Sequence, residues 1–322
     1  METITLANKN GLKLEISTLG ATITQLLIPS RNRKNVNVIA SLQNIKDYNS
    51  QQYIKEGLYL GSTIGRFAGR ISKGYFEIDN IKYPIYTKNK VHLHGGKVGF
   101  DKKIWTIEDC SQTSAKLSIL SPHMEEGYPG NLSVSVTFSV TENNMVKLNY
   151  EARTDKTTVL NLTNHSYFNL DGSGTILNHR LQIESDAYLE VDKTLIPTGR
   201  VLPVKSSSYD FTKLKEIGQP DFKGLDDTYV LRSNPLKATL ESEQSGIQMR
   251  VYSNQPAMVV FTSPEFPNFN FKGGASYSKF PAICFETQHY PDAPHHSNFP
   301  TTFLRPKDTY RQETCFEFIA LP

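Results

Sequence analysis

The sequence is poor in cysteine and has no excess of charge of one sign. Its three cysteines, Cys110, Cys284 and Cys315, are odd in number, far apart and without a C-x-x-C pair. Neither a disulfide framework nor a cysteine zinc site is therefore expected. The 35 Lys and Arg against 32 Asp and Glu leave a net charge of +3, spread without long single-sign runs. This balance argues against a nucleic-acid partner and against a polybasic membrane surface.

Long apolar runs are also missing. No stretch approaches the roughly 18–20 apolar residues that a membrane helix needs. The first residues, from Met1 to Leu6, lack a basic region followed by an apolar one, which a secretory signal requires. We therefore expect a cytoplasmic protein with no membrane partner.

The sequence instead shows many short segments in which apolar and polar residues alternate. Residues 132–140 alternate in this way, meet the polar residues 141–144, and are followed by a second alternating run at 145–152. This pattern predicts a long antiparallel hairpin. Further strands are predicted at 12–19, 75–83, 116–120, 187–191, 238–241, 247–252, 258–262, 283–286 and 314–319. Clusters of Gly, Pro, Asn and Asp separate them, as is typical of an all-β sandwich or barrel.

Helical signal is weak and is confined to short segments. Residues 210–218 have a candidate N-cap at Asp210 and a stop at Gly218, and residues 41–48 are a second candidate. Because strands and helices do not alternate along the chain, a doubly wound nucleotide-binding fold is disfavoured. No composition shift marks a linker, so we predict one domain spanning residues 1–322. The Pro-rich stretch 291–300 is predicted to be an ordered loop.

Three glycines recur every four residues at Gly61, Gly65 and Gly69. A phosphate-binding loop would end in Lys-Ser/Thr or precede a helix, and neither follows here. The glycines are therefore interpreted as turn residues. Arg66 and Arg70 would share one face of a strand, and an arginine lining a pocket suits a ligand rich in hydroxyl acceptors.

Two histidines, His92 and His94, would point to one side of an extended strand. This pair alone is half of a metal site, and no Glu follows within a few residues. The favoured interpretation is that His94 is a polar pocket residue and His92 an ordinary strand histidine. We expect no metal and no other cofactor.

Residues 161–170 surround His165 with Asn, Thr and Ser, which can fix the tautomer and orientation of an imidazole. The alternative is a polar turn with an exposed histidine, but the adjacent Tyr-Phe pair favours burial. Asp226 and Asp227 lie where a strand begins. One of them could accept hydrogen bonds from ligand hydroxyl groups, and the alternative is that both belong to a solvated turn.

Glu286 follows an apolar run and is the best carboxylate candidate for catalysis. Burial raises the pKa of a carboxyl group, which suits a general base that works near neutral pH. The competing interpretation is a glutamate at a strand end that faces water.

Taken together and in this order, these segments resemble the aldose 1-epimerase (galactose mutarotase) family. The resemblance covers residues 12–318. It rests on Gly65-Arg-Phe-Ala-Gly-Arg-Ile71, Leu93-His-Gly-Gly96 with Gly99-Phe-Asp101, Thr163-Asn-His-Ser-Tyr-Phe-Asn-Leu170, Gly224-Leu-Asp226, Asn254-Gln-Pro256, Phe285-Glu-Thr-Gln288, and Pro291-Asp-Ala293 with Leu304-Arg-Pro306.

The resemblance implies a large all-β antiparallel supersandwich with few short helices. It also implies an isomerase that interconverts the α and β anomers of free aldohexoses such as glucose and galactose. By the same resemblance Glu286 is the general base and His165 the general acid. The sugar-binding positions are Arg70, His94, Asp226 and Gln255. A monomer or homodimer is expected, with a small-molecule aldohexose as its partner.

One position departs from the family pattern, because Gly69 stands where an Asn often precedes the pocket arginine. The departure concerns the choice of sugar rather than the reaction. Three alternatives remain at this point. One is an epimerase for hexose 6-phosphates, with Lys97, Lys102 and Lys103 near the His94 loop. Another is a non-catalytic sugar-binding module of the same fold. The last is a glycoside hydrolase that uses Asp226 and Glu286.

Overall fold

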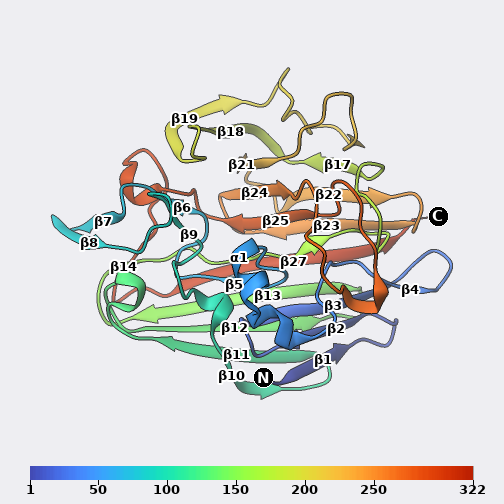
Figure 1. Ribbon diagram of the computed structural model, residues 1–322, viewed down its shortest axis with the longest axis horizontal. Helices are drawn as coiled ribbons and strands as arrows, with labels where there is room; N and C mark the ends of the chain where they lie inside the picture. The colour runs from blue at the N-terminus through green and yellow to red at the C-terminus, as the bar shows by residue number, and fades with distance from the viewer. Residues whose placement is uncertain (322) are drawn as a thin grey trace.

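The computed structural model describes residues 1–321 as an assembly of antiparallel sheets (Figure 1). The largest sheet has nine strands in the order β10 (Thr106–Cys110), β11 (Ser114–Ser121), β12 (Leu132–Val140), β13 (Met145–Thr154), β27 (Tyr310–Ala320), β23 (Ile247–Ser253), β22 (Leu236–Ser242), β17 (Arg180–Ile183) and β20 (Lys215–Glu216). The second has six strands in the order β16 (Tyr167–Phe168), β25 (Ile283–Gln288), β24 (Ala257–Thr262), β21 (Asp226–Leu231), β18 (Ser185–Val191) and β19 (Pro197–Pro203).

Smaller units complete the fold. A four-stranded sheet contains β1 (Thr3–Ala7), β2 (Lys13–Ser17), β3 (Thr22–Pro29) and β4 (Asn35–Asn37). Four two-stranded pairs are β14 (Thr158–Val159) with β26 (Phe303–Leu304), β15 (Thr163–Asn164) with β5 (Thr63–Ile64), β6 (Arg70–Ile71) with β9 (His92–Leu93), and β7 (Tyr75–Ile78) with β8 (Ile81–Pro84). The α-helix is α1 (Gln51–Glu56), and short 3-10 turns are η1 (Ile45–Asn49), η2 (Phe100–Lys102), η3 (Glu125–Gly127), η4 (Lys272–Gly274) and η5 (Ala293–His295).

One hydrophobic cluster joins the three larger sheets. It contains Leu148 and Phe316 from the nine-stranded sheet, Phe168 and Phe285 from the six-stranded sheet, and Leu14 from the four-stranded sheet. Alternate residues of each strand face this cluster, because successive side chains in a strand point to opposite faces of the sheet. The prediction of an all-β sandwich architecture is therefore confirmed.

The predicted hairpin is confirmed, with β12 paired to β13 from Leu132↔Thr154 to Val140↔Val146. The predicted strand at 75–83 is instead a hairpin of two strands, β7 and β8. Its turn residues, Asp79 and Asn80, both have positive φ. Asn and Asp tolerate this left-handed conformation, which a two-residue hairpin turn requires.

The predicted helix at 210–218 is wrong. The Asp210 carboxylate accepts hydrogen bonds from the backbone N–H and the hydroxyl of Thr212, which closes a local turn. Residues 215–216 then pair with β17 as strand β20. Short polar side chains compete with helical hydrogen bonds in this way. The second candidate, 41–48, overlaps the 3-10 turn η1, and the α-helix begins just after it, capped by the Ser50 side chain.

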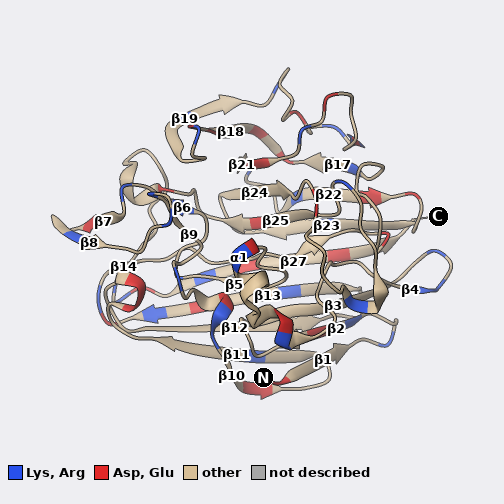
Figure 2. Cartoon of the chain, viewed as in Figure 1, with Lys and Arg blue, Asp and Glu red and all other residues tan. Residues whose placement is uncertain are grey.

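Charge is distributed over the whole molecule, and Figure 2 shows basic and acidic positions interspersed along the strands. Within residues 1–321, no helix is long and apolar enough to cross a membrane. All three cysteines are free, and Cys284 and Cys315 are buried.

Arg66 and Arg70 do not share a face, contrary to the prediction. Arg66 is 2% exposed, and its guanidinium donates hydrogen bonds to the Ser121 hydroxyl and to the carbonyls of Ser121, Pro122, Pro129 and Gly130. Burial lowers the pKa of Arg66 to about 10, so it remains charged at pH 7. It therefore anchors the segment that precedes Arg70.

Replacing Arg66 by Lys should reduce the free energy of unfolding by about 3 kcal/mol, because a single ammonium group cannot satisfy acceptors arranged around a planar guanidinium. Urea denaturation measures the change. The exposed Arg153→Lys is the matched control and should change stability by less than about 0.5 kcal/mol. An Arg66→Lys variant as stable as the control would contradict this anchoring role.

Candidate active site

A cavity of about 190 Å³ opens beside the six-stranded sheet. Strands β21, β24 and β25 provide one wall, and the segments around Tyr59, Arg70, His94 and His165 provide the others. Five of the six predicted site residues line it, namely Glu286, His165, Arg70, His94 and Asp226. Gln255 does not.

Glu286 lies in the middle of strand β25, opposite Val259 of β24. The side chain is almost fully buried, and its Oε2 atom has no hydrogen-bond partner among residues 1–321. Burial raises the pKa of Glu286 to about 8, the negative charge of Asp226 adds to the rise, and Arg70 opposes it. The interpretation of Glu286 as a solvent-facing strand end is therefore wrong.

His165 directly follows strand β15 and is also buried. Its ring stacks on Tyr167 at 4.9 Å between centroids. The neighbouring Asn164 and Ser166 do not hold the imidazole, contrary to expectation, because Asn164 bonds to the Gly61 carbonyl and to Ser166. These polar residues order the backbone, and the ring is oriented by aromatic packing. Within the part of the chain that the structure describes, its Nδ1 atom has no hydrogen-bond partner.

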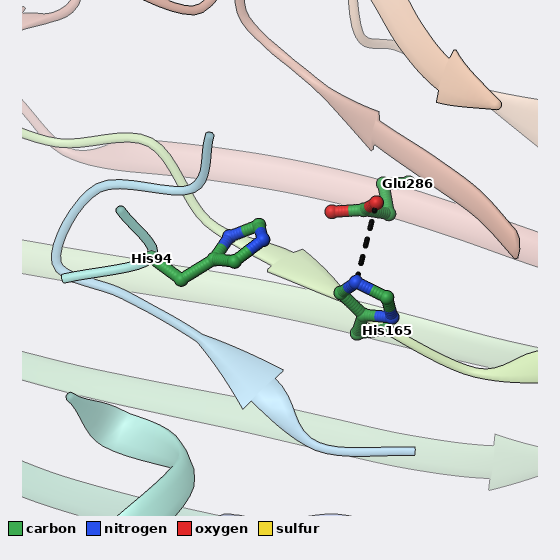
Figure 3. Close-up of side chains that lie close together, drawn as sticks. All are labelled: His94, His165 and Glu286. Carbon is green, nitrogen blue, oxygen red and sulfur yellow. Dashed lines mark ion pairs between the residues drawn. The ribbon is translucent and has the colours of Figure 1, made fainter. Parts of the chain in front are cut away.

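The two groups lie next to one another at the wall of the cavity, with His165 Nε2 3.4 Å from Glu286 Oε1 (Figure 3). Burial lowers the pKa of His165 to about 4, while it raises that of Glu286. Each shift disfavours the charged form in a site shielded from water. Burial therefore favours the arrangement in which both groups are neutral.

His94 is the third side chain of this group (Figure 3). It has left strand β9, with φ of +50°, so it does not point to the same side as His92. The His92 ring instead bonds to the Tyr128 hydroxyl and to the Tyr86 carbonyl. The predicted division of roles between the two histidines agrees with these positions, but the expected shared face is wrong.

The backbone N–H of Gly69 donates a hydrogen bond to His94 Nδ1 at 3.2 Å. Burial, followed by the nearby His165 and Arg70, lowers the pKa of His94 well below its usual value, so the ring is neutral. A neutral imidazole that accepts at Nδ1 carries its proton on Nε2. His94 therefore presents an N–H donor, which suits a ligand oxygen.

This hydrogen bond also bears on metal binding. Donor atoms of His94, His165 and Glu286 lie within 4.8 Å of one another, a spacing at which three ligands can hold a cation. A metal needs a lone pair on each imidazole and an ionised carboxylate. A free lone pair on His94 would require loss of its hydrogen bond from the Gly69 backbone N–H. Ionisation of Glu286 is opposed by its raised pKa. The group is better suited to moving protons.

Arg70 and Asp226 form an ion pair at the rim of the cavity, with Arg70 Nη2 3.3 Å from Asp226 Oδ2. Asp226 is the first residue of β21 and lines the cavity, whereas Asp227 is buried behind it and accepts a hydrogen bond from the Asp226 backbone N–H. Burial raises the pKa of Asp227 to about 6. Of the two acids, Asp226 is the one available to a ligand.

Gln255 lies before strand β24, where its amide nitrogen donates to Asn254 Oδ1. Its side chain is buried, and its Oε1 atom accepts no hydrogen bond from residues 1–321. Gly69 lies nearer the cavity, with φ of +81°. A Cβ at this position would lie 3.0 Å from Pro291 and 3.1 Å from the Gln288 side chain. This crowding leaves little room for the Asn side chain that the family often has at the position of Gly69.

The aromatic residues of the cavity are Tyr59, Tyr167 and Phe261, and none of them was predicted as a site residue from the sequence. Tyr59 has a positive φ and packs against His94, with 4.8 Å between ring centroids. Such a conformation is rare for a bulky residue and occurs at functional sites. Nothing in the local sequence signals it, because Tyr59 follows a helix that the pattern did not predict.

Comparison with known proteins places these features in a family. The sequence profile of aldose 1-epimerase matches residues 2–317. The chain is 40% identical to a galactose mutarotase from Pongo abelii and 39% identical to one from Homo sapiens, in each case over 95% of this chain and 91% of the relative. An aldose epimerase homologue from C. elegans has a similar structure, with a TM-score of 0.93 and 30% identity, covering 100% of this chain and 99% of the other.

Glu286 should make the protein less stable as pH rises. The folded state keeps a proton on Glu286 that the unfolded chain releases above about pH 4.5, so stability falls between there and about pH 8. Gln at 286 does not titrate. The unfolding free energy of Glu286→Gln minus that of the wild type should therefore grow from pH 5 to pH 8 and then level off.

Urea denaturation of both proteins at pH 5, 6.5, 8 and 9 measures this difference, and titrations common to the two proteins cancel. The exposed Glu243→Gln is the matched control, for which no such growth is expected. A difference that is constant with pH would show that the carboxyl group ionises normally in the fold.

Proposed function

Since the chain belongs to the aldose 1-epimerase family, we propose that Glu286 and His165 open and reclose the ring of a free aldohexose. The protein is an isomerase with mutarotase activity on aldoses. The observation that carries the proposal is the buried contact between the Glu286 carboxyl group and the His165 ring, at the wall of a cavity that fits one sugar ring.

Mutarotation transfers one proton away from the sugar and one proton to it. Glu286 takes the proton of the anomeric hydroxyl while His165 gives a proton to the ring oxygen O5. The C1–O5 bond then breaks, and its electron pair stays on O5, which leaves an open-chain aldehyde. Rotation about C1–C2 presents the other face of the carbonyl group, and the reverse transfers close the ring as the other anomer. Each positioned acid or base typically contributes about 10²–10⁴-fold.

The number of protons on the pair stays at one throughout this cycle. Ring opening starts from ionised Glu286 and protonated His165, and it ends with a neutral carboxyl group and a neutral imidazole. Burial favours the neutral arrangement. The protonation state of the resting site is therefore that of the open-chain intermediate, and hydroxyl groups of a bound sugar must stabilise the ionised arrangement.

The remaining cavity residues hold the sugar in this proposal. His94 donates from Nε2 to a sugar oxygen, the Arg70 guanidinium donates to a second, and Asp226 accepts from a hydroxyl group. Tyr59 and Phe261 supply apolar walls against which a sugar face packs. Gln255 keeps its sugar-binding assignment from the family resemblance alone, because its side chain lies outside the cavity lining.

We further propose that residues 1–322 act as one domain. The shared hydrophobic cluster of the three larger sheets supports it, and so does a site whose walls come from segments between residues 56 and 291. The glycoside hydrolase alternative loses support, because Asp226 is paired with Arg70 and the group facing Glu286 is an imidazole.

Glu286→Gln and His165→Asn should each reduce catalysed anomer exchange by about 10²–10⁴-fold while the protein stays folded. Polarimetry of freshly dissolved α-glucose and α-galactose measures the rate after subtraction of the uncatalysed one. Glu243→Gln is the control and should exchange anomers at the wild-type rate. Rates in either variant within threefold of the wild type would refute the assigned roles, provided that circular dichroism shows a native spectrum.

The pH profile of kcat/KM should be bell-shaped, since only the singly protonated pair contains both a base and an acid. The acidic limb is expected near pH 4, below which His165 is protonated as well as Glu286 and no base remains. The alkaline limb is expected near pH 8, above which neither group holds a proton and no acid remains. Polarimetric rates between pH 3.5 and 9.5 test this expectation. A rate that continues to rise above pH 9 would show that no acid is needed.

A further inference from the structure

A buried carboxylate, that of Asp292, directly follows a residue of the cavity wall, and the proposed mechanism does not use it. Strand β25 carries Glu286 and leads into the loop 291–300, which contains the turn η5. The first residue of this loop, Pro291, lines the cavity. Asp292 does not line it and is 2% exposed. A buried carboxylate needs compensating hydrogen bonds, so its partners indicate its role.

Asp292 contacts strand β6 at two points. Its backbone N–H donates to the Arg70 carbonyl at 2.7 Å, and its Oδ1 atom accepts from the Ser72 backbone N–H at 2.8 Å. The two hydrogen bonds enclose Ile71 and take the place of a neighbouring strand. On its other side β6 pairs with β9 (Figure 1). Asp292 therefore completes the hydrogen bonding of a strand that is only two residues long.

Two histidines of the same loop surround the Asp292 carboxylate. His295 Nδ1 lies 2.7 Å from Oδ1, and His296 Nε2 lies 3.4 Å from Oδ2. Because an ionised carboxylate can only accept hydrogen bonds, the His295 tautomer with its proton on Nδ1 fits this contact. The His295 ring also packs against Tyr75 of β7, with 5.8 Å between centroids. These contacts hold the carboxylate in one orientation, toward β6.

The ordinary role of an aspartate at this position is to cap a helical turn, and Asp292 does not have it. It occupies the N-cap position of η5, but its side chain accepts no hydrogen bond from the N–H groups of that turn. Its φ of +56° is rare for a residue other than glycine, although Asp tolerates it. Such conformations occur where a side chain must be aimed at one target. Here the target is the Ser72 N–H, which is 220 positions away in the chain.

Arg70 depends on this backbone support, because its side chain is weakly held. Its guanidinium makes one contact with Asp226, at 3.3 Å, and the two side chains are 23% and 30% exposed. A partly exposed ion pair of this kind contributes little to fixing a long side chain. The Arg66 guanidinium anchors the chain before Arg70, and Asp292 anchors it at Arg70 and directly after it. The position of the guanidinium in the cavity therefore follows from both anchors.

We propose that Asp292 is a positioning residue that fixes strand β6 and thereby holds the Arg70 guanidinium where it meets a sugar oxygen. This inference rests on the proposed function, in which Arg70 binds the sugar. Asp292 contacts neither the sugar nor the reacting atoms. It acts on binding through Arg70, and the proton transfers of Glu286 and His165 are unchanged. Loss of its carboxylate therefore raises KM and leaves kcat nearly constant.

The kinetic test compares Asp292→Gly with Asp292→Asn. Glycine adopts a positive φ without strain and removes the carboxylate, whereas Asn keeps an oxygen that accepts from the Ser72 N–H. Polarimetry at pH 7 should show that Asp292→Gly raises KM for glucose about tenfold, with kcat within about threefold of the wild type. Asp292→Asn should keep both constants within about threefold, because the acceptor rather than the charge fixes β6.

A double-mutant cycle shows whether the effect passes through Arg70. In an Arg70→Gln background, Asp292→Gly should change KM by less than about twofold, since the group that it positions is already missing. Asp171→Gly is the matched control. The Asp171 carboxylate also accepts a distant backbone N–H, that of Ser245 at 3.2 Å, and lies beside a histidine, but it does not line the cavity. This variant should keep the wild-type KM.

Hydrogen exchange of the Ser72 amide, followed by NMR on the folded proteins, tests the anchoring without any sugar. The amide should exchange at least about tenfold faster in Asp292→Gly than in the wild type, and at a nearly unchanged rate in Asp292→Asn. An unchanged rate in Asp292→Gly would show that β6 does not need this carboxylate, and would overturn the inference.

Three kinetic outcomes would also overturn it. The first is a wild-type KM in Asp292→Gly. The second is an equal rise of KM in the Arg70→Gln background, which would show an effect that does not pass through Arg70. The third is a rise of KM in Asp171→Gly as large as in Asp292→Gly, which would show a general response to a weakened fold. In each case the wild type still turns glucose over, so the proposed function stands. Absence of turnover by the wild type would refute the proposed function and with it a role in sugar binding, whatever the exchange rates show of β6.

Discussion

The proposed activity depends on one contact, between a carboxyl group and an imidazole that are 121 positions apart in the chain and both buried. Neither side chain is positioned by residues that are close to it in the sequence. Glu286 is fixed by the pairing of β25 with β24, and His165 by the pairing of β15 with β5. The Thr163 hydroxyl joins the two units by donating to the Thr287 carbonyl at 3.0 Å. Asn161, which is fully buried, bonds to the carbonyls of Ala68 and His289 and so ties the Arg70 segment to the same framework.

Exclusion of water from this contact has opposite effects on stability and on catalysis. Burial raises the pKa of Glu286 to about 8 and lowers that of His165 to about 4. Each group therefore destabilises the folded state when it is charged. The same exclusion favours a single proton on two groups 3.4 Å apart, which is the number that the proposed exchange of protons with the sugar needs. The site therefore depends on a stable surrounding fold, and the continuous core of three sheets provides it.

The fold class was predictable from the sequence because strand periodicity is a local signal, and β12 with β13 shows it over their full lengths. Helices were not predictable, since Asp210 has the residue type of a helix cap but bonds to Thr212 in a turn. The site was predicted through motifs of the family, which located Glu286, His165, Arg70, His94 and Asp226 at the cavity. Tyr59 and the partner of His94 were not predicted, because both depend on backbone conformations at Tyr59, Gly69 and His94 that have positive φ.

Tyr59 packs against His94 with 4.8 Å between ring centroids, and it lines the cavity together with Arg70 and Asp226. The last two residues are paired with each other at 3.3 Å, so each charged group is held in one orientation. In the proposed function this pairing sets where a neutral sugar meets a hydrogen-bond donor and where it meets an acceptor. The proton transfers at C1 then depend on Glu286 and His165 alone.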